Sequence, residues 1–244
     1  MKAGKRETEK GKRRRTVLLG RFPLNIFRFP APVFFWAMPF ITFEGVEGSG
    51  KSTQLRLAAE KLRAVGREVV ETREPGGTAI GSTLREILMD AGNMGLDPVA
   101  EWLLLEADRR QHVREVLQPS AARGAFVLCD RYSDTTEAYQ QVGRGLDARA
   151  VRSVDAIARD GLLPDLTLLY DVDPGDGLAR SRARDGGRSD RFAAAGLEFH
   201  QRVREAYLEI ARREPGRVRV ISSDAPRDRV SAETWRILSE RFSL

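Results

Sequence analysis

Five short apolar runs, separated by stretches with helical periodicity, constrain most strongly what this chain of 244 residues can fold into. The runs cover residues 40–43, 68–72, 125–130, 165–172 and 218–222. Helices are predicted at 51–65, 79–90, 98–118 (ended by Pro119), 134–142, 147–160, 174–184, 195–213 and 226–242. Strands that alternate with helices form parallel sheets, and uniformly apolar strands are covered on both faces. The pattern therefore predicts a three-layer α/β fold with a five-stranded parallel sheet and helices on both faces.

The positive net charge of the chain, +6 at neutral pH, is concentrated in its first 37 residues. These hold ten Lys or Arg and two acidic residues, which amounts to +8, so residues 38–244 carry −2. Any nucleic-acid-binding function is therefore expected to involve this basic leader and not residues 38–244. Prolines and arginines interrupt the apolar pieces of the leader, which excludes a secretory signal core.

Three interpretations of the leader, residues 1–37, remain open. It is a targeting or nucleic-acid-binding tail, a disordered extension without a role, or an artefact of start-site choice. We favour the third, because Met38 stands two residues before the first strand. The chain has no apolar run long enough for a transmembrane helix, and its single cysteine, Cys129, excludes an internal disulfide. Both features suit a protein of the cytoplasm.

Residues 45–52, Gly-Val-Glu-Gly-Ser-Gly-Lys-Ser, match the pattern G-x-x-x-x-G-K-[ST] directly after the first strand. The glycines let several backbone N–H groups point at one anion, and the next helix adds its N-terminus. Lys51 is expected to reach the β- and γ-phosphates of a nucleotide, and Ser52 to bind Mg²⁺. The fold is thus expected to be P-loop NTPase-like. The predicted nucleotide-binding residues are Gly45, Val46, Glu47, Gly48, Ser49, Gly50, Lys51, Ser52 and Thr53.

Charged residues also follow the second and third strands. Arg73 opens the turn Arg-Glu-Pro-Gly-Gly, and Asp130 and Arg131 end the third apolar run. Ligands of parallel sheets lie at the carboxyl ends of the strands, so these side chains are expected beside the phosphate loop. Arginine binds phosphate bidentately, and an acid at this place in P-loop proteins holds Mg²⁺. The cations exceed what one triphosphate requires, which favours phosphoryl transfer between two anions.

Successive motifs resemble those of the thymidylate kinase family in order and spacing. They are FEGVEGSGKSTQ (43–54), TREPGGT (72–78), ADRRQHV (107–113), DRYSDTTEAYQ (130–140), GRG (143–145) and PDLTLLYDV (164–172). The resemblance covers about residues 39–242 and makes 38–244 a nucleoside monophosphate kinase domain. It implies phosphorylation of dTMP to dTDP by ATP with Mg²⁺, usually in a homodimer. By position it implies that Arg73 and Arg131 hold the dTMP phosphate, and that Glu47 lies near the 3′-hydroxyl of the sugar or the metal.

The resemblance also implies a base site. Arg109 would bond the edge of thymine, and Thr136, Tyr139 and Gln140 would surround the base and the deoxyribose. Leu105 and Arg109 are four residues apart and so share one face of a helix. The family usually has phenylalanine at the position of Leu105, so aliphatic contact is expected in place of ring stacking.

The arginine-rich segment 180–192 is a candidate lid. Some members of the family carry a catalytic arginine in the phosphate loop, where this chain has Gly48 and Ser49. The chain therefore resembles the bacterial type of the family, in which lid arginines cover the transferring phosphoryl group. The predicted catalytic residues are Lys51, Arg131, Arg184, Arg188 and Arg191, and the predicted Mg²⁺ ligands are Ser52 and Asp130.

Other functions remain open from the residues alone. Another kinase of the P-loop class would share the phosphate loop, and only the base site separates the two. A GTPase is disfavoured, because the sequence has neither Asn-Lys-x-Asp nor Asp-x-x-Gly. A nucleic-acid-binding protein would have to use the basic leader.

Overall fold

The computed structural model describes Met1, residues 39–184, Gly186 and residues 191–244. Most of the leader and Arg188 of the candidate lid lie outside the described residues. The interpretations offered for them above therefore stay predictions.

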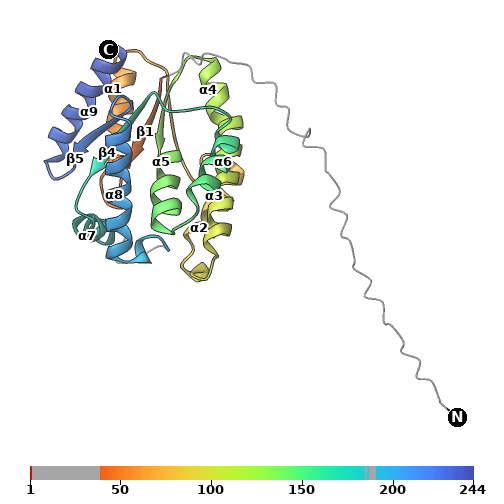
Figure 1. Cartoon of the computed structure of the whole chain (residues 1–244). Coiled ribbons are helices and arrows are strands. Elements are labelled where there is room, and N and C mark those ends of the chain that lie inside the picture. The colour runs from red at the N-terminus through yellow and green to blue at the C-terminus, as the bar shows by residue number, and fades with distance from the viewer. Residues whose placement is uncertain (2–38, 185, 187–190) are drawn as a thin grey trace. The chain divides into compact units, whose positions relative to one another are not determined.

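Five parallel strands form one sheet, which confirms the fold expected from the alternating pattern (Figure 1). They are β1 (Phe40–Glu44), β2 (Val69–Arg73), β3 (Phe126–Asp130), β4 (Leu166–Asp171) and β5 (Val218–Ser222). The strand order is β2-β3-β1-β4-β5, so β1 lies in the middle of the sheet. The first strand of the chain therefore delivers its loop to the centre of the sheet edge.

Helices connect consecutive strands, as parallel pairing requires. The longer ones are α1 (Lys51–Ala64), α2 (Ala79–Met89), α3 (Pro98–His112), α6 (Ala148–Arg159), α7 (Pro174–Arg184), α8 (Leu197–Arg213) and α9 (Arg227–Phe242). The shorter ones are η1 (Ala91–Asn93), η2 (Val113–Leu117), α4 (Gln118–Ala122), α5 (Ser133–Thr136), η3 (Glu137–Gly143) and η4 (Ala193–Ala195). Several start at a capping side chain: Thr78, Asp97, Asp147 and Asp173 accept N–H bonds from the first turns of α2, α3, α6 and α7.

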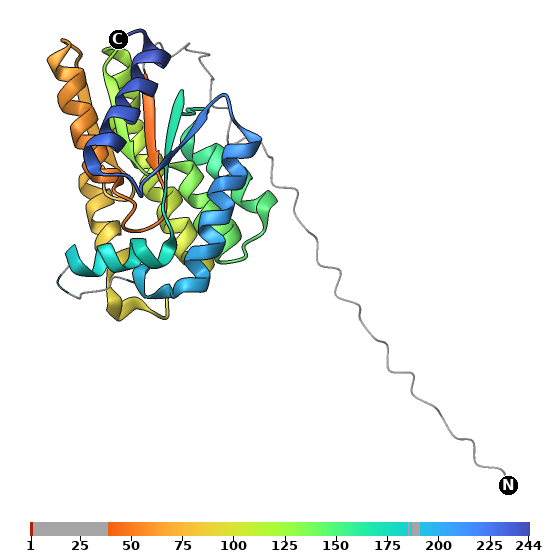
Figure 2. The ribbon, with the colours of Figure 1, turned by 90° about the vertical axis from the view of Figure 1, so that its left-hand side faces the viewer.

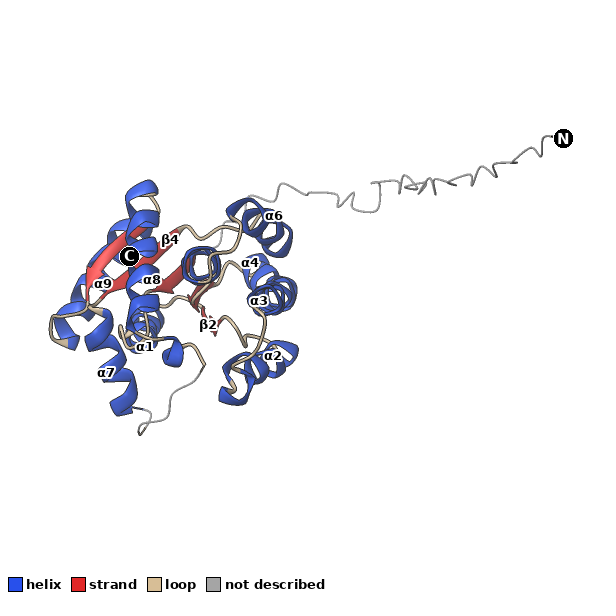
Figure 3. Cartoon of the chain, turned by 60° about the horizontal axis from the view of Figure 1, so that its bottom comes forward, coloured by secondary structure: helices blue, strands red, loops and turns tan. Residues whose placement is uncertain are grey.

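Both faces of the sheet are covered, and β1 is buried along its whole length. Ile41 and Phe43 pack on one side with α1 and α9, which lie next to each other (Figure 2). Phe40 points to the opposite face and packs with Val113 and Leu117 of η2. Figure 3 shows the strands enclosed by helices in this way. This double coverage explains why the strands have no polar alternation in sequence.

The helix that begins at residue 98 does not end at Pro119, contrary to the prediction. It continues through the π-helical turn η2 into α4, and the N–H of Gln118 bonds the carbonyl of Val113, five residues back. The following α4 then has the proline in its first turn, where a missing N–H costs little.

The carboxyl ends of the three adjacent strands β2, β3 and β1 meet at one end of the sheet. Asp130, the last residue of β3, pairs in register with Arg73 of β2 and Phe43 of β1. The charged residues that follow these strands are thereby brought next to the loop after β1. Among the described helices, none has the length and apolar character needed to cross a membrane.

Candidate active site

The predicted phosphate loop, residues 45–53, connects β1 to α1. Gly48 has a φ of +69°, and a Cβ there would lie 1.9 Å from the carbonyl oxygen of Gly177. Gly50, the residue that caps α1, has a φ of +85°. The left-handed backbone favours glycine at both positions, and at Gly48 the close approach also leaves no room for a side chain. The loop conformation thus follows from its own sequence.

Lys51 is buried under this loop. Its Nζ donates to the carbonyl oxygen of Val46 at 2.8 Å and to Oγ of Ser49 at 3.3 Å. Burial first, and then the charge of Arg131, lowers the pKa of Lys51 to about 8, while nearby carboxylates, Glu47 foremost, act in the opposite direction. A bound anion in the loop would favour the charged ammonium in the same way as those carboxylates.

Ser52 and Asp130 meet across the gap between α1 and β3. The Oγ of Ser52 lies 2.5 Å from Oδ2 of Asp130. The two residues are 78 positions apart and are brought together because β1 and β3 are neighbours in the sheet. A hydroxyl and a carboxylate oxygen side by side form the kind of donor set that Mg²⁺ prefers.

Arg131 projects from the end of β3 toward the loop and is held by several partners. Its Nη2 donates to Oε2 of Glu47 at 3.1 Å and to the hydroxyl of Tyr139 at 3.3 Å, and its Nη1 to the hydroxyl of Tyr207 at 3.2 Å. The guanidinium also lies over the ring of Tyr139, 5.0 Å from its centroid. Burial would raise the pKa of Glu47, but Arg131, Lys51 and Arg184 outweigh it and lower that pKa, so Glu47 is ionised.

A cavity of about 380 Å³ unites the loop with the charged strand ends. Of the predicted site residues, its lining contains Glu47, Gly48, Gly50, Lys51, Ser52, Thr53, Arg73, Leu105, Asp130, Arg131, Tyr139, Gln140 and Arg184. Gly45, Val46 and Ser49 belong to the same loop but are buried behind it. The lining also contains residues that sequence reasoning missed, which are Glu74, Pro75, Arg85, Met89, Thr135 and Phe192.

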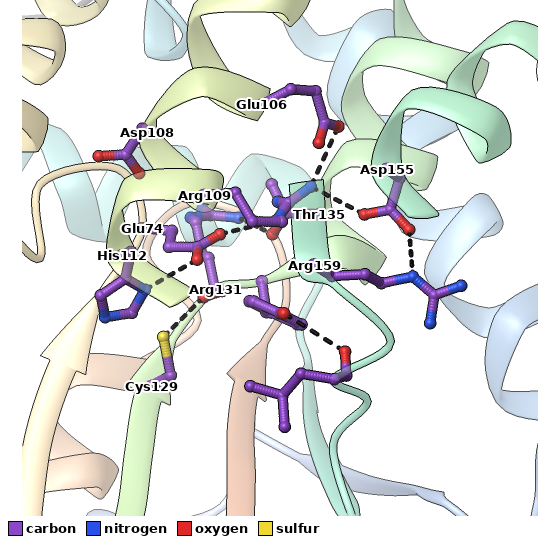
Figure 4. A network of polar contacts seen from close by, with 12 residues as sticks. Glu74, Glu106, Asp108, Arg109, His112, Cys129, Arg131, Thr135, Asp155 and Arg159 are labelled. Atoms are coloured by element: carbon purple, nitrogen blue, oxygen red, sulfur yellow. Dashed lines mark hydrogen bonds and ion pairs between the residues drawn. The ribbon is translucent and has the colours of Figure 1, made fainter. Parts of the chain in front are cut away.

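Arg109, which the resemblance places at the edge of thymine, does not line this cavity. Figure 4 shows its side chain among Glu74, Glu106 and Asp155. Its side chain is 3% exposed. Its Nε lies 2.9 Å from Glu74, and its Nη1 lies 3.1 Å from Glu106 and 3.0 Å from Asp155. Burial opposes the charge of Arg109, but these carboxylates outweigh it and keep its pKa well above the usual range. The guanidinium is therefore held by acids that come from three different parts of the fold.

Thr136 is a second departure from the predicted base site. It is 2% exposed and lies outside the cavity, whereas the preceding Thr135 lines it. Thr135 and Tyr139 are four residues apart on one helical segment, α5 and η3, and therefore share a face. Spacing alone does not separate the two threonines, because Thr136 is likewise four residues before Gln140, which also lines the cavity.

The candidate lid arginines separate into different environments. Arg184, at the end of α7, lines the cavity, and its Nη2 lies 3.9 Å from Oε1 of Glu47. Arg191 does not: its Nη1 lies 2.5 Å from Glu101 of α3, and its Nε donates to the carbonyl of Leu88 at 3.0 Å. With 3% exposure and a place outside the cavity lining, Arg191 is a buried anchor in this structure, and a catalytic role for it stays a prediction. The sequence shows the run of arginines, but it does not show that the carboxylate of Glu101 pairs with Arg191.

The phosphate loop offers donors for one triphosphate, and the arginines at the neighbouring strand ends line the same cavity and add more positive charge than one triphosphate requires. This arrangement places the protein among the P-loop kinases that act on small phosphorylated acceptors.

Comparisons with known proteins narrow the class. A family model described as thymidylate kinase matches residues 43–234. A thymidylate kinase of Solidesulfovibrio magneticus is 48% identical over 206 residues, which are 82% of this chain and 99% of that protein. One of Deinococcus radiodurans is 48% identical over 202 residues, 83% of this chain and 97% of that protein. The crystal structure of thymidylate kinase from Ehrlichia chaffeensis superimposes with a TM-score of 0.68 at 35% identity, covering 83% of this chain and 98% of that one.

The chain belongs to the thymidylate kinase family. Its reaction is the phosphorylation of dTMP to dTDP, with ATP as the phosphoryl donor.

Proposed function

We propose that ATP binds with its phosphates in the loop 45–53, and that the phosphate of dTMP binds between Arg73 and Arg131. The observation that carries this proposal is the shared cavity, which the loop and both strand-end arginines line together. Each arginine offers a planar fork of N–H donors that suits a phosphate. The two substrates would then face each other with their phosphates adjacent and their negative charges screened.

Transfer requires an oxygen of the dTMP phosphate to attack the γ-phosphorus of ATP in line. The bond from that phosphorus to the bridging oxygen of ADP breaks as the new bond forms. Lys51, Arg131 and Arg184 border the cavity and would stabilise the charge on the transferring group. Arg188 stays a further candidate for this role.

Ser52 and Asp130 fit a Mg²⁺ ion, because they place a hydroxyl and a carboxylate 2.5 Å apart beside the loop. We propose that they hold it directly or through its waters. The ion supplies charge neutralisation between the phosphates of ATP when it is bound. Glu47, ionised and next to Arg131, would accept a hydrogen bond from the 3′-hydroxyl of the sugar or from a water of the ion.

The base of dTMP is proposed to lie against Leu105, Tyr139 and Gln140. Gln140 donates through Nε2 to Glu101 at 2.8 Å, and its Oε1 is buried without a hydrogen-bond partner among the described residues. A buried acceptor without a donor costs free energy, and the N3–H of thymine would satisfy it. Arg109 acts on this site through Glu74, whose carboxylate it shares with His112.

A homodimer is proposed on the outer face of α2, α3 and α6. These helices pack side by side and expose Ile80, Ile87, Val99, Leu103 and Ile157, between 41% and 64% each. Such a cluster of large apolar side chains suits an interface. In sedimentation velocity, Leu103→Glu should give a monomer while Val65→Glu, on an exposed apolar residue elsewhere, stays dimeric. A monomeric wild type would rule the proposal out.

A location in the cytoplasm is proposed from Cys129, which is completely buried as a free thiol. Burial raises the pKa of this thiol well above its usual range, so the thiol is unreactive. A fold with a free buried thiol does not depend on an oxidising compartment. Fractionation of cells that express the protein tests the assignment.

The function is tested by measuring ADP release from ATP and Mg²⁺ with dTMP, dUMP, dCMP, dGMP, UMP and thymidine as acceptors. Strong turnover with dTMP is expected. Arg73→Ala should raise the KM for dTMP about 10- to 100-fold, because a charge-assisted hydrogen bond contributes about 1.5–3 kcal/mol. The matched control is Arg149→Ala, an exposed arginine of α6 outside the cavity. Equal kinetics for the two variants would refute the placement of the dTMP phosphate.

A further inference from the structure

Glu44, the last residue of β1, is a completely buried carboxylate directly before the phosphate loop. In the described part of the chain it has no ion pair with Lys or Arg, and its partners are three neutral donors. The N–H of Tyr132 donates to Oε1 at 2.7 Å, and the hydroxyls of Thr135 and Tyr207 lie 2.6 Å and 3.0 Å from Oε2. Burial, and then the charge of Asp134, raises its pKa to about 7. A side chain kept for packing alone would be better apolar.

The backbone that Glu44 contacts is unusual. Arg131 has a φ of +71°, in the left-handed region that side chains other than glycine rarely adopt. The end of β1 holds the peptides on both sides of this residue. The N–H of Arg131 donates to the carbonyl of Phe43 at 3.1 Å, and the N–H of Tyr132 donates to the carboxylate of Glu44. The Glu44 side chain thus holds the peptide that follows Arg131 in this turn.

The hydroxyls that contact Glu44 also contact the guanidinium of Arg131. Its Nη1 lies 3.4 Å from Oγ1 of Thr135 and 3.2 Å from the hydroxyl of Tyr207, and the two hydroxyls are 2.7 Å apart. Arginine only donates and a carboxylate only accepts, so neither hydroxyl points its proton at Arg131. At least one of the two hydroxyls donates to Glu44, and the other donates to Glu44 or across the 2.7 Å contact to its neighbour. Ionised Glu44 is the acceptor that leaves lone pairs of both hydroxyls for Arg131.

We propose that Glu44 is a positioning residue of the reaction, which holds Arg131 in its left-handed conformation and orients its guanidinium toward the phosphate of dTMP. The inference rests on the proposed role of Arg131 in binding that phosphate. The consequence is that one residue contributes to both substrate sites. Glu44 directly precedes the loop proposed to bind ATP, and its side chain positions the arginine proposed to bind dTMP.

The test is Glu44→Gln in the full-length protein. The amide can still accept from Tyr132, but its nitrogen donates, so one hydroxyl must turn its proton toward Arg131. The KM for dTMP should rise about tenfold, the loss expected for one hydrogen bond to a charged group, while the KM for ATP stays within about twofold. A folded variant with an unchanged KM for dTMP would overturn the proposal, as would an equal rise for both substrates.

A pH profile gives a second readout. Protonated Glu44 would donate as the amide does, so wild type should lose affinity for dTMP below about pH 7 relative to the Gln variant. The ionisation of dTMP itself is common to both proteins and cancels in the ratio. The titratable or charged groups that face Glu44 from the surrounding elements are Lys51, Cys129, Arg131, Asp134, Tyr139 and Tyr207. Parallel profiles for the two proteins would count against the proposal.

Two further variants keep the test decisive. If Glu44→Gln does not fold, Tyr207→Phe removes one of the oriented hydroxyls and keeps the ring. It should raise the KM for dTMP selectively, and no change would overturn the proposal. Arg131→Ala separates the inference from the function on which it rests. If Arg131→Ala binds dTMP normally, the proposed role of Arg131 in binding the phosphate is wrong. If it binds dTMP poorly, that role stands, and the Glu44 variants decide whether Glu44 positions Arg131.

Discussion

Arg184→Ala and Arg191→Ala should have opposite effects, although both arginines belong to the same candidate lid. Arg191 is buried and paired with Glu101, and removal of one partner of a buried ion pair costs about 3–5 kcal/mol. Glu101 keeps Arg144 at 3.0 Å and Gln140 at 2.8 Å, so we expect the lower end, about 3 kcal/mol. For a domain of this size that corresponds to a fall in Tm of about 6–12 °C.

The two variants are compared by calorimetry and by ADP release at 25 °C. Arg191→Ala should keep kcat within about threefold of wild type while its Tm falls. The Arg184 side chain is 60% exposed at the cavity, so Arg184→Ala should keep its Tm within about 1 °C and lose about tenfold or more in kcat. The reasoning is refuted if Arg191→Ala keeps its Tm and loses kcat, because the buried anchor would then be a catalytic group.

Three further predictions concern α3. Burial raises the pKa of Glu106 to about 7, above its value in the unfolded chain, so its contribution to stability is present below about pH 4.5 and is lost as the pH rises through 7. Between pH 5 and 8 the free energy of unfolding in urea should therefore fall by about 3 kcal/mol more in wild type than in Glu106→Gln. Equal pH dependence of the two proteins would contradict this. Arg109→Met leaves three acids without their shared cation and should lower Tm by more than Arg191→Ala does; an unchanged Tm with a raised KM for dTMP would indicate direct contact with the base. Leu105→Phe should lower the KM for dTMP by about two- to tenfold through stacking, with the KM for ATP as control, and a raised KM would mean that the ring does not fit.

The fold was predictable because its signals are local and repeated. Each strand is a short apolar run, and the all-buried pattern of β1 is what a central strand of a covered sheet requires. The phosphate loop was predictable for a related reason, since Gly48 and Gly50 adopt positive φ values that their neighbours cannot. The convergence of Arg73, Asp130 and Arg131 followed from the general rule for parallel sheets.

The base site was predicted less well, because spacing along a helix says which residues share a face but not where a long side chain ends. Arg109 shares a face with Leu105, yet its guanidinium reaches Glu74 and Asp155, which are distant in sequence. Thr136 and Thr135 are adjacent, and the twist of the segment decides which of them reaches the cavity. Arg85, Met89 and Phe192 gave no signal in the sequence, since each enters the cavity through the packing of its helix or loop.

The sequence by itself determined the parallel sheet, the phosphate loop and the set of cations at one edge, because periodicity, glycine dihedral angles and strand ends are local properties. Only the tertiary structure decided which arginines line the cavity and which are held by buried carboxylates. A buried guanidinium is held by whichever carboxylates lie within a few ångströms. Glu74 and Asp155 at Arg109, and Glu101 at Arg191, come from other parts of the chain than the arginine they hold. The same long-range contacts bring the carboxylate of Glu44 to the hydroxyls beside Arg131, and no spacing in the chain predicts them.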